Sequence, residues 1–393
     1  MVRVTGSGAR NSPAQRGATV IFDGRYIQDR YHGIGRYAFH LVRELAALSP
    51  DHSFEVLADP AAPNTRFDFA SLEEMANVQV RQVSLPLFSL KEQVALPRVL
   101  RAYRSALYHT PYFAVPWLVP TDAQSIVTVH DCIFERDSRY MPKPWARIYY
   151  RLLMRASMRR SRLVAVPSKS TAADVRRFYG VPRHKLVITP EAADVAFRTI
   201  DDKQFLSQLR KAYNLPQSFV LAVGMRRPHK NFLTLVRAIG KLDDAALVFV
   251  GDADERFPDE VAATAQGLGN RVCFLGKIPE ADLSGLYNLA AALACPSLVE
   301  GFGLPLVEAM ASGTPLICSD IPVFREVAGD AALFVPARDE AAWASAVATV
   351  LESSVLQADL RRLGLERSRH FSWRAAAAPL LPHYTRLLSM VQP

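Results

Sequence analysis

Two carboxylates, Glu300 and Glu308, lie eight positions apart around a glycine-rich segment, directly after an apolar run at 289–295. The pattern predicts a buried strand, a turn and a helix that starts near Pro305. The glycines break the helix between the carboxylates, so Glu300 is expected on the turn and Glu308 about one turn into the helix. A polyol could then hydrogen-bond to both carboxylates, while a phosphate could bind the backbone N–H groups of Gly301 to Gly303 and the helix N-terminus.

The stretch Glu-Gly-Phe-Gly-Leu-Pro-x3-Glu-Ala-Met-Ala-x-Gly-Thr-Pro, which starts at Glu300, resembles the donor-site signature of retaining GT-B glycosyltransferases of family 4 (group 1). The resemblance covers residues 18–390 and implies transfer of a sugar from a nucleotide diphosphate sugar with retained anomeric configuration. It implies that Glu300 holds the sugar and that Glu308 takes the ribose hydroxyls. The donor-binding residues implied on the turn are Gly301, Phe302, Gly303 and Leu304.

A second motif is the basic segment 223–231, which follows the strand expected to open the second domain. The resembling family has a glycine here, an arginine soon after and a lysine about six residues past the glycine. Gly224 and Lys230 fit this spacing, and the resemblance implies that Lys230 meets the donor phosphates as a compact point charge. Met225 occupies the usual arginine position, so Arg226 is the first choice for the second cation and Arg227 stays open. A solvated basic turn is the alternative interpretation.

Two further segments in the first half carry the resemblance. Gly33 and Gly35 form a loop between the first strand and helix, where small residues allow a ligand to approach the backbone. The resemblance implies that this loop, with Arg36, touches the donor diphosphate. His130 ends an apolar strand, at the edge where doubly wound sheets bind ligands. In the resembling family the His-Asp pair faces the transferred sugar, and the histidine need not act as a base.

The mechanism implied by the resemblance uses no metal and no protein nucleophile. Arg226 and Lys230 neutralise the leaving diphosphate, and the departing phosphate itself accepts the proton of the acceptor. Asp252 and Asp254 match an Asp-x-Asp motif only formally, because they fall in an expected loop after a second-domain strand. We therefore expect no metal and no cofactor beyond the nucleotide sugar substrate.

The pattern along the chain predicts an α/β protein with the GT-B fold, two doubly wound Rossmann-like domains facing across a cleft. Expected strands lie at 18–23, 53–58, 78–83, 106–109, 125–130, 162–167, 185–189, 219–223, 246–251, 272–274, 291–296, 315–318 and 332–335. Expected helices lie at 37–48, 233–241, 280–290, 306–311 and 373–388. The expected domains are a disordered tail at 1–17, an acceptor-side domain at 18–200, a donor-binding domain at 201–372 and a C-terminal helix at 373–393 that crosses back to the first domain.

The charge is unevenly shared along the 393 residues. Residues 1–200 contain 28 Lys+Arg and 17 Asp+Glu, or +11, and the remainder contains 19 and 21, or −2, which together give the net charge of +9. A helix expected from Pro144 repeats arginine every four positions, at Arg147, Arg151, Arg155 and Arg159, with an apolar flank of Trp145, Tyr149, Leu152 and Met158. An anionic membrane or lipid-phosphate site would have this pattern, and so would an ordinary solvated helix face.

Composition bounds the compartment and the competing functions. No stretch is long and apolar enough to span a bilayer, and the four cysteines lack paired or metal-type spacing, which predicts a reduced cytosol. The basic first half and its arginine stripe add peripheral association with the inner face of a bacterial membrane as an expectation. No nucleic-acid-binding signature is present. The favoured function is transfer of a hexose to a saccharide or lipid-linked acceptor in surface polysaccharide synthesis. The loop Gly-Ile-Gly-Arg-Tyr at 33–37, the His-Asp pair at 130–131 and the segment Pro-Glu-Ala-Ala-Asp at 190–194 are together similar to bacterial O-antigen and capsule mannosyltransferases. This similarity makes GDP-mannose the first donor; the alternatives are a UDP-sugar transferase or epimerase and a non-catalytic nucleotide-sugar-binding protein.

Overall fold

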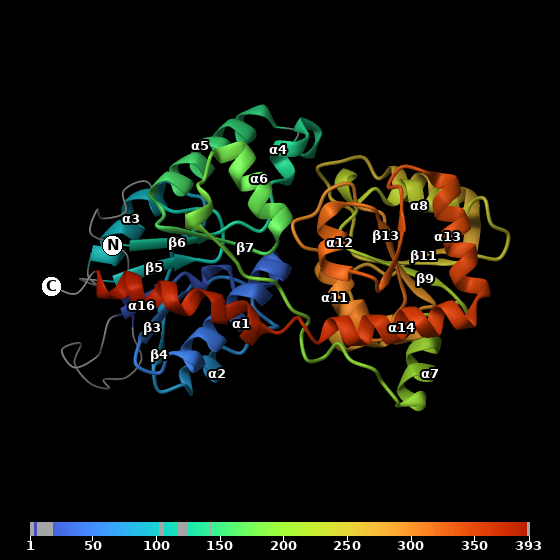
Figure 1. The fold of residues 1–393 in the computed structure, drawn as a ribbon, viewed down its shortest axis with the longest axis horizontal. Coiled ribbons are helices and arrows are strands. Elements are labelled where there is room, and N and C mark those ends of the chain that lie inside the picture. The colour runs from blue at the N-terminus through green and yellow to red at the C-terminus, as the bar shows by residue number, and fades with distance from the viewer. Residues whose placement is uncertain (1–3, 6–18, 102–105, 117–123, 142, 391–393) are drawn as a thin grey trace. The chain divides into compact units, whose positions relative to one another are not determined.

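A computed structural model describes residues 4–5, 19–101, 106–116, 124–141 and 143–390 (Figure 1). The chain forms two compact units. Unit 1 holds the described residues up to Cys132, Pro144–Glu191 and those from Trp373 onward, and unit 2 holds Ile133–Lys143 and Ala192–Ser372. The units differ from the expected domains in two places. The boundary follows Glu191 rather than residue 200, and the segment 133–143 belongs to unit 2 rather than to the first domain.

Unit 1 is built on an eight-stranded sheet with the order β1-β4-β3-β2-β5-β6-β7-β8. Its strands are β1 (Val4–Thr5), β2 (Thr19–Phe22), β3 (Ser53–Ala58), β4 (Val78–Val83), β5 (Ala106–Thr110), β6 (Gln124–Thr128), β7 (Leu163–Val166) and β8 (Leu186–Ile188). All pairings are parallel among these strands except that of β1 with β4. The strand β1 lies within the expected disordered tail, and the rest of 1–17 falls outside the described residues.

Unit 1 also takes in the C-terminal helices. Its helices are α1 (His32–Leu48), α2 (Phe69–Glu73), α3 (Leu90–Arg101), α5 (Pro144–Arg160), α6 (Lys169–Tyr179), α15 (Trp373–Ala377) and α16 (Leu381–Ser389). The ring of Trp373 stacks on His40 of α1 with centroids 5.0 Å apart. The hydroxyl of Tyr384 hydrogen-bonds to His109 of β5, whose pKa burial lowers to about 3. These buried contacts hold the chain's last two helices against the sheet and first helix of unit 1.

Unit 2 is built on a six-stranded parallel sheet with the order β11-β10-β9-β12-β13-β14. Its strands are β9 (Val220–Val223), β10 (Leu247–Val250), β11 (Val272–Phe274), β12 (Ala292–Cys295), β13 (Leu316–Ser319) and β14 (Ala332–Val335). Its helices are α4 (Ile133–Arg136), α7 (Lys203–Ala212), α8 (Phe232–Ile239), α9 (Glu260–Ala265), α10 (Glu280–Leu289), α11 (Leu304–Ala311), α12 (Pro322–Ala328), α13 (Glu340–Glu352) and α14 (Ser354–Ser368).

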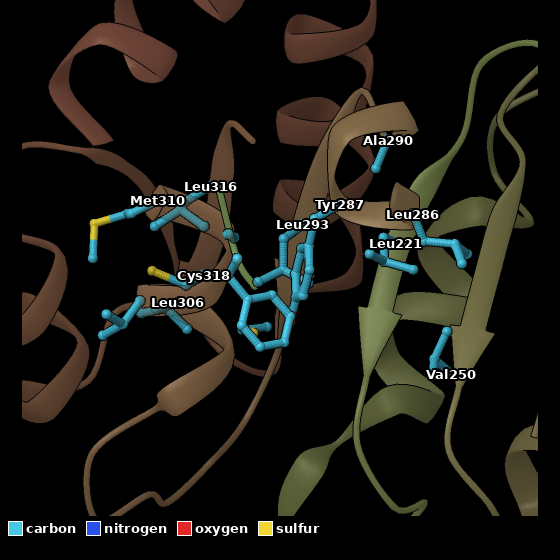
Figure 2. Packing of buried hydrophobic residues seen from close by; sticks show 14 of the residues in the cluster. Leu221, Val250, Leu286, Tyr287, Ala290, Leu293, Leu306, Met310, Leu316 and Cys318 are labelled. Atoms are coloured by element: carbon cyan, nitrogen blue, oxygen red, sulfur yellow. The ribbon is translucent and has the colours of Figure 1, made fainter. Parts of the chain in front are cut away.

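The unit 2 sheet is buried on both faces because helices cover both. Successive strand residues point to opposite faces, so Leu221 of β9 packs in one apolar cluster and its neighbours Val220 and Ala222 in another. Figure 2 shows the first cluster, where Tyr287 of α10 and Leu306 of α11 pack beside the strand residues. Burial on both faces explains why the strands read as continuous apolar runs. The strand order makes β9 and β12 neighbours, so the loops after them meet at one sheet edge.

Candidate active site

The turn between β12 and α11 carries Glu300. Gly303 ends it with φ +103°, and a Cβ at that position would lie 2.8 Å from a ring carbon of Phe324. A side chain therefore does not fit, and the glycine sets the point at which α11 begins, with Pro305 in its first turn. The predicted order of strand, glycine turn and helix is confirmed, and the helix starts at Leu304.

The Glu300 carboxylate forms an ion pair with Lys230, which follows β9. Lys230 Nζ lies 2.7 Å from Glu300 Oε1, and the Ser297 hydroxyl donates to the same oxygen at 2.7 Å. Burial would lower the pKa of Lys230, but the Glu300 carboxylate raises it above its ordinary value. Burial would likewise raise the pKa of Glu300, but Lys230 holds it below its ordinary value. Both side chains are therefore charged at neutral pH, in a site where their side chains are only 19% and 11% exposed.

Two glycines allow the loop after β9 and the loop after β10 to pack against each other. Gly224 has φ +135°, and a Cβ there would contact Lys230 Cε at 3.6 Å. Gly251 has φ +121°, and a Cβ there would lie 2.5 Å from the carbonyl oxygen of Gly224. A side chain at residue 251 would push the two loops apart, so the backbone there can approach that of Gly224 only as glycine.

Glu308 lies in α11 and is 4% exposed. Its Oε2 accepts a hydrogen bond of 2.9 Å from the hydroxyl of Tyr287, whose ring is part of the cluster in Figure 2. The carboxylate is thus oriented by a core side chain of α10. Its expected role toward the ribose hydroxyls remains a prediction, as do the donor contacts expected of Gly301, Phe302 and Leu304.

Arg226 and Lys230, the two cations expected to act on one diphosphate, form their contacts on opposite sides of β9. Arg226 binds both carboxylate oxygens of Asp259 at 2.9–3.2 Å, donates to the carbonyl of Gly251 and lies over the ring of Phe274 at 4.7 Å. These partners belong to the β10 and β11 side of the sheet, whereas Lys230 reaches the β12 side. Arg227 pairs instead with Asp254 at 2.8 Å. The structure thus holds Arg226 in an internal ion pair rather than beside Lys230.

The segment 133–143 packs on unit 2 next to this loop. The ring of Tyr140 meets His229 edge-on at 5.5 Å, and the His229 carbonyl accepts the backbone N–H of Leu298 at 2.8 Å. Burial lowers the pKa of His229 to about 4, so its ring is neutral. Beside it lies an open hollow of about 570 Å³, lined by Arg136, Asp137, Tyr140, Leu298, Val299, Pro336, Ala337 and Arg338. The segment therefore forms one wall next to the turn of Glu300.

In unit 1, His130 lies two residues beyond β6 rather than at the end of the strand. Its Nδ1 is 2.9 Å from Glu191 Oε1, and its Nε2 is 2.8 Å from the carbonyl oxygen of Pro111. Both acceptors require an N–H, so the geometry selects the doubly protonated ring. Burial would lower the pKa of His130, but its hydrogen bond and charge interaction with Glu191 raise it. Both ring nitrogens are thus used within unit 1, and the expected contact with sugar hydroxyls remains a prediction.

The expected glycine loop of unit 1 is helical. Gly33 and Gly35 lie in the first turns of α1, which begins at His32 and not at Tyr37 as expected. Gly33 is exposed, whereas a Cβ on Gly35 would lie 3.0 Å from the carbonyl oxygen of Tyr26. Packing therefore favours glycine at position 35, and Arg36 is buried beside it. The donor contacts expected of these residues remain predictions.

Sequence reasoning missed the partners that orient the site. These partners contact the predicted residues directly or next to them in the chain: Glu191 binds His130, Asp259 binds Arg226, Ser297 binds Glu300, and Tyr140 packs on His229 beside Lys230. Only Glu191 carried a signal, because it falls in the segment 190–194 that contributed to the family resemblance. In the described part of the chain, no cluster of His, Cys, Asp or Glu is arranged to hold a metal, and no helix is long and apolar enough to cross a membrane.

Comparison with known proteins decides the family. Residues 31–197 match the model described as Glycosyltransferase Family 4, and residues 207–367 match Glycosyl transferases group 1. The O-antigen chain mannosyltransferase RfbU of Salmonella typhimurium is 30% identical over 259 residues, 65% of this chain and 68% of that protein. The chain belongs to the family 4, group 1 glycosyltransferases. The O-antigen chain mannosyltransferase B of Escherichia coli is 26% identical over 94% of this glycosyltransferase and 100% of its own length.

Solved structures share the fold of this glycosyltransferase. Sucrose-phosphate synthase from Thermosynechococcus elongatus matches with a TM-score of 0.73 at 23% identity, over 95% of this chain and 100% of that one. Anabaena HepE in complex with UDP-glucose matches with a TM-score of 0.72 at 19% identity, over 94% and 99%. The predicted GT-B fold, with two Rossmann-like units, is confirmed.

We predict that the Glu191→Gln substitution lowers the pKa of His130. The carboxylate raises this pKa above 6.5 in the folded protein, so its contribution to stability is fully present below the unfolded pKa. That contribution is lost as the pH rises through the folded value. NMR titration of the His130 ring protons measures the change, with Glu44→Gln in unit 1 as the control. An unchanged His130 titration in Glu191→Gln would contradict the assignment of the pair.

Proposed function

We propose that this glycosyltransferase moves mannose from GDP-mannose to a saccharide or lipid-linked acceptor in bacterial surface polysaccharide synthesis, with retention at the anomeric carbon. The observation that carries the proposal is the buried Lys230–Glu300 pair at the carboxyl edge of the unit 2 sheet, beside a glycine turn and a helix N-terminus. The names of the O-antigen mannosyltransferase relatives support the sugar and the pathway class. A UDP-sugar donor is the second candidate, favoured by the UDP-glucose complex of a protein with the same fold.

In this proposal the ion pair serves the donor by exchanging partners. Without a donor, Lys230 and Glu300 satisfy each other's charge. When the donor binds, its diphosphate offers anionic oxygens to Lys230 and its sugar offers hydroxyl donors to Glu300, so neither charge is left buried and alone. The N–H groups of the turn and the start of α11 add partial positive charge on the same side. Ser297 keeps the carboxylate in place during the exchange.

The proposed chemical step needs no protein nucleophile. The bond from the anomeric carbon to the leaving phosphate oxygen breaks while the acceptor oxygen bonds to that carbon from the same face. The departing phosphate oxygen takes the acceptor's proton, which balances the charge. Positive charge held near that oxygen lowers the barrier, because negative charge develops there in the transition state.

The proposal includes metal independence. Lys230 supplies fixed positive charge where the leaving group develops negative charge. The formal Asp-x-Asp motif is not directed at a cation site, because Asp254 binds two arginines, Arg227 and Arg256, at 2.6–2.8 Å. The hydrogen bonds from Arg256 and Arg227 hold the pKa of Asp254 well below its ordinary value, so its carboxylate is ionised and its charge is already balanced by guanidinium groups.

The proposal also places the acceptor with unit 1, at the inner face of the cell membrane. The first 200 residues carry +11 and the remainder −2. Such a surface attracts an anionic partner, either the phosphates of a lipid-linked saccharide or the membrane that carries it.

For the donor, we expect GDP-mannose to raise the thermal unfolding temperature more than UDP-glucose or dTDP-glucose at equal concentration. A ligand at 100 times its dissociation constant adds about 2.7 kcal/mol to the stability of the state that binds it. A thermal-shift panel measures this, with free mannose as the control for non-specific effects. Stabilisation by UDP-glucose alone would replace the first donor with the second.

For the site, we expect Lys230→Ala and Glu300→Gln each to reduce transfer by about a hundredfold at saturating donor, which corresponds to roughly 3 kcal/mol of barrier. The matched controls are Lys241→Ala and Glu340→Gln, which break an exposed ion pair in the same unit. Because a single change leaves a buried charge, the double variant Lys230→Ala, Glu300→Ala should recover stability but not activity. Near wild-type turnover in both single variants rules out this site.

For the metal, we expect transfer to continue at an unchanged rate in excess EDTA, since fixed side-chain charge stabilises the leaving group. Initial rates with and without EDTA, and with added magnesium or manganese, measure this. A large loss that either ion restores would show that the leaving group depends on a cation.

A further inference from the structure

Helix α5 of unit 1 exposes a ridge of large apolar side chains. Trp145, Ile148 and Leu152 are 68%, 60% and 55% exposed. Their spacing of three and four residues places them on one helix face. Among the helix side chains that the structure describes, no other helix exposes more than one large apolar residue; α3 and α14 expose one each, Val94 and Val355. A contiguous apolar ridge on a folded helix indicates a contact surface.

The ridge is not needed to attach α5 to unit 1. The opposite face of the helix buries Tyr150, Leu153 and Met154, and the Ser157 hydroxyl accepts the backbone N–H of Val115 at 2.9 Å. The expected apolar flank was therefore wrong in part: Met158 is buried and Tyr149 is half-buried, while Ile148 was not expected and is exposed. The inner face fixes the helix, so the outer ridge is free for a partner.

The charge around the ridge restricts what that partner can be. The helix carries five arginines and no acidic residue. Arg155 and Arg159 lie seven residues after Ile148 and Leu152, so they continue the same face, and both are exposed. Arg147 and Arg151 lie to one side and are half-buried. A second copy of this face would bring arginine against arginine, which is repulsive. An anionic bilayer offers acyl chains to the ridge and phosphates to the arginines.

We propose that α5 docks the enzyme on an anionic lipid bilayer, with Trp145, Ile148 and Leu152 at the acyl-chain boundary and Arg155 and Arg159 on lipid phosphates. The inference rests on the proposed function only in supplying a reason for docking, a lipid-linked acceptor. The docking surface lies in unit 1 and the proposed donor site in unit 2, so the two are tested separately. Tryptophan at the boundary and arginine at the headgroups are the side chains that an interfacial helix uses.

The test is co-sedimentation of the full chain with phosphatidylcholine vesicles, with and without phosphatidylglycerol, at low and high salt. Three variants are compared with wild type: Trp145→Ser, Ile148→Ser, Leu152→Ser together; Arg155→Gln, Arg159→Gln together; and Val355→Ser as the control for an exposed apolar residue on another helix. Wild type and the control should bind vesicles with phosphatidylglycerol. At both salt concentrations the ridge variant should bind these vesicles at least tenfold more weakly than wild type. The arginine variant should bind at least tenfold more weakly than wild type at low salt. Thermal unfolding of all variants should match wild type, because the changed side chains are exposed.

Two further measurements separate the outcomes. Trp145 fluorescence should shift to the blue on phosphatidylglycerol vesicles, with Trp145→Phe as the background, since the other described tryptophans, Trp343 and Trp373, are buried. Stabilisation by GDP-mannose should be equal in wild type and the ridge variant, so failure of docking leaves the donor proposal standing. Equal vesicle binding by wild type and the ridge variant overturns the inference. Self-association of the lipid-free wild type that the ridge variant abolishes, without vesicle binding, also overturns it.

Discussion

The ion pair between Lys230 and Glu300 is the interaction on which the arrangement of the donor side depends. Each charge alone would be costly to bury, and removing one partner strands the other. The pair exists because β9 and β12 are neighbours in the sheet, so the loops that follow them meet. Gly224 adopts the positive φ at the start of the loop that carries the lysine, and Ser297 fixes the carboxylate. The two apolar faces of the sheet keep these loops in register, which gives the rigid core a role in site geometry.

Unit 1 repeats the same physical solution with different residues. His130 follows β6 and Glu191 follows β8, and the carbonyl of Pro111 follows β5, so the charged ring is held where three loops leave one sheet edge. In both units a cation and a carboxylate come from separate loops at the carboxyl ends of parallel strands, where α/β folds place their ligands. The scaffold sets the position of the groups, and the short loops supply the chemistry.

The sequence predicted the strands well because parallel strands buried on both faces are continuous apolar runs. The bounds of β3, β4, β11 and β14 were those expected. Side-chain partners were less accessible, since Asp259 lies 33 residues from Arg226 and Glu191 lies 61 residues from His130, and local pattern carries no information on such pairs. The assignment of 133–143 to unit 2 reflects long-range contacts such as that of Tyr140 with His229, which lies 89 residues further along the chain. The helical start of α1 was missed because glycines are typical of loops.

The balance of charge at the edge of unit 2 bears on how a diphosphate would be attracted. Lys230 with Glu300 and Arg226 with Asp259 are each neutral as pairs, so at a distance each acts only as a dipole. Asp254 is shared by Arg227 and Arg256, which leaves one net positive charge in that group. The field of a net charge falls off more slowly than that of a dipole. In the proposed function, the group around Asp254 would therefore attract an anion toward the loop after β9. Because the side chain of Arg227 is 35% exposed and that of Arg226 only 12%, we expect Arg227 rather than Arg226 to meet the diphosphate.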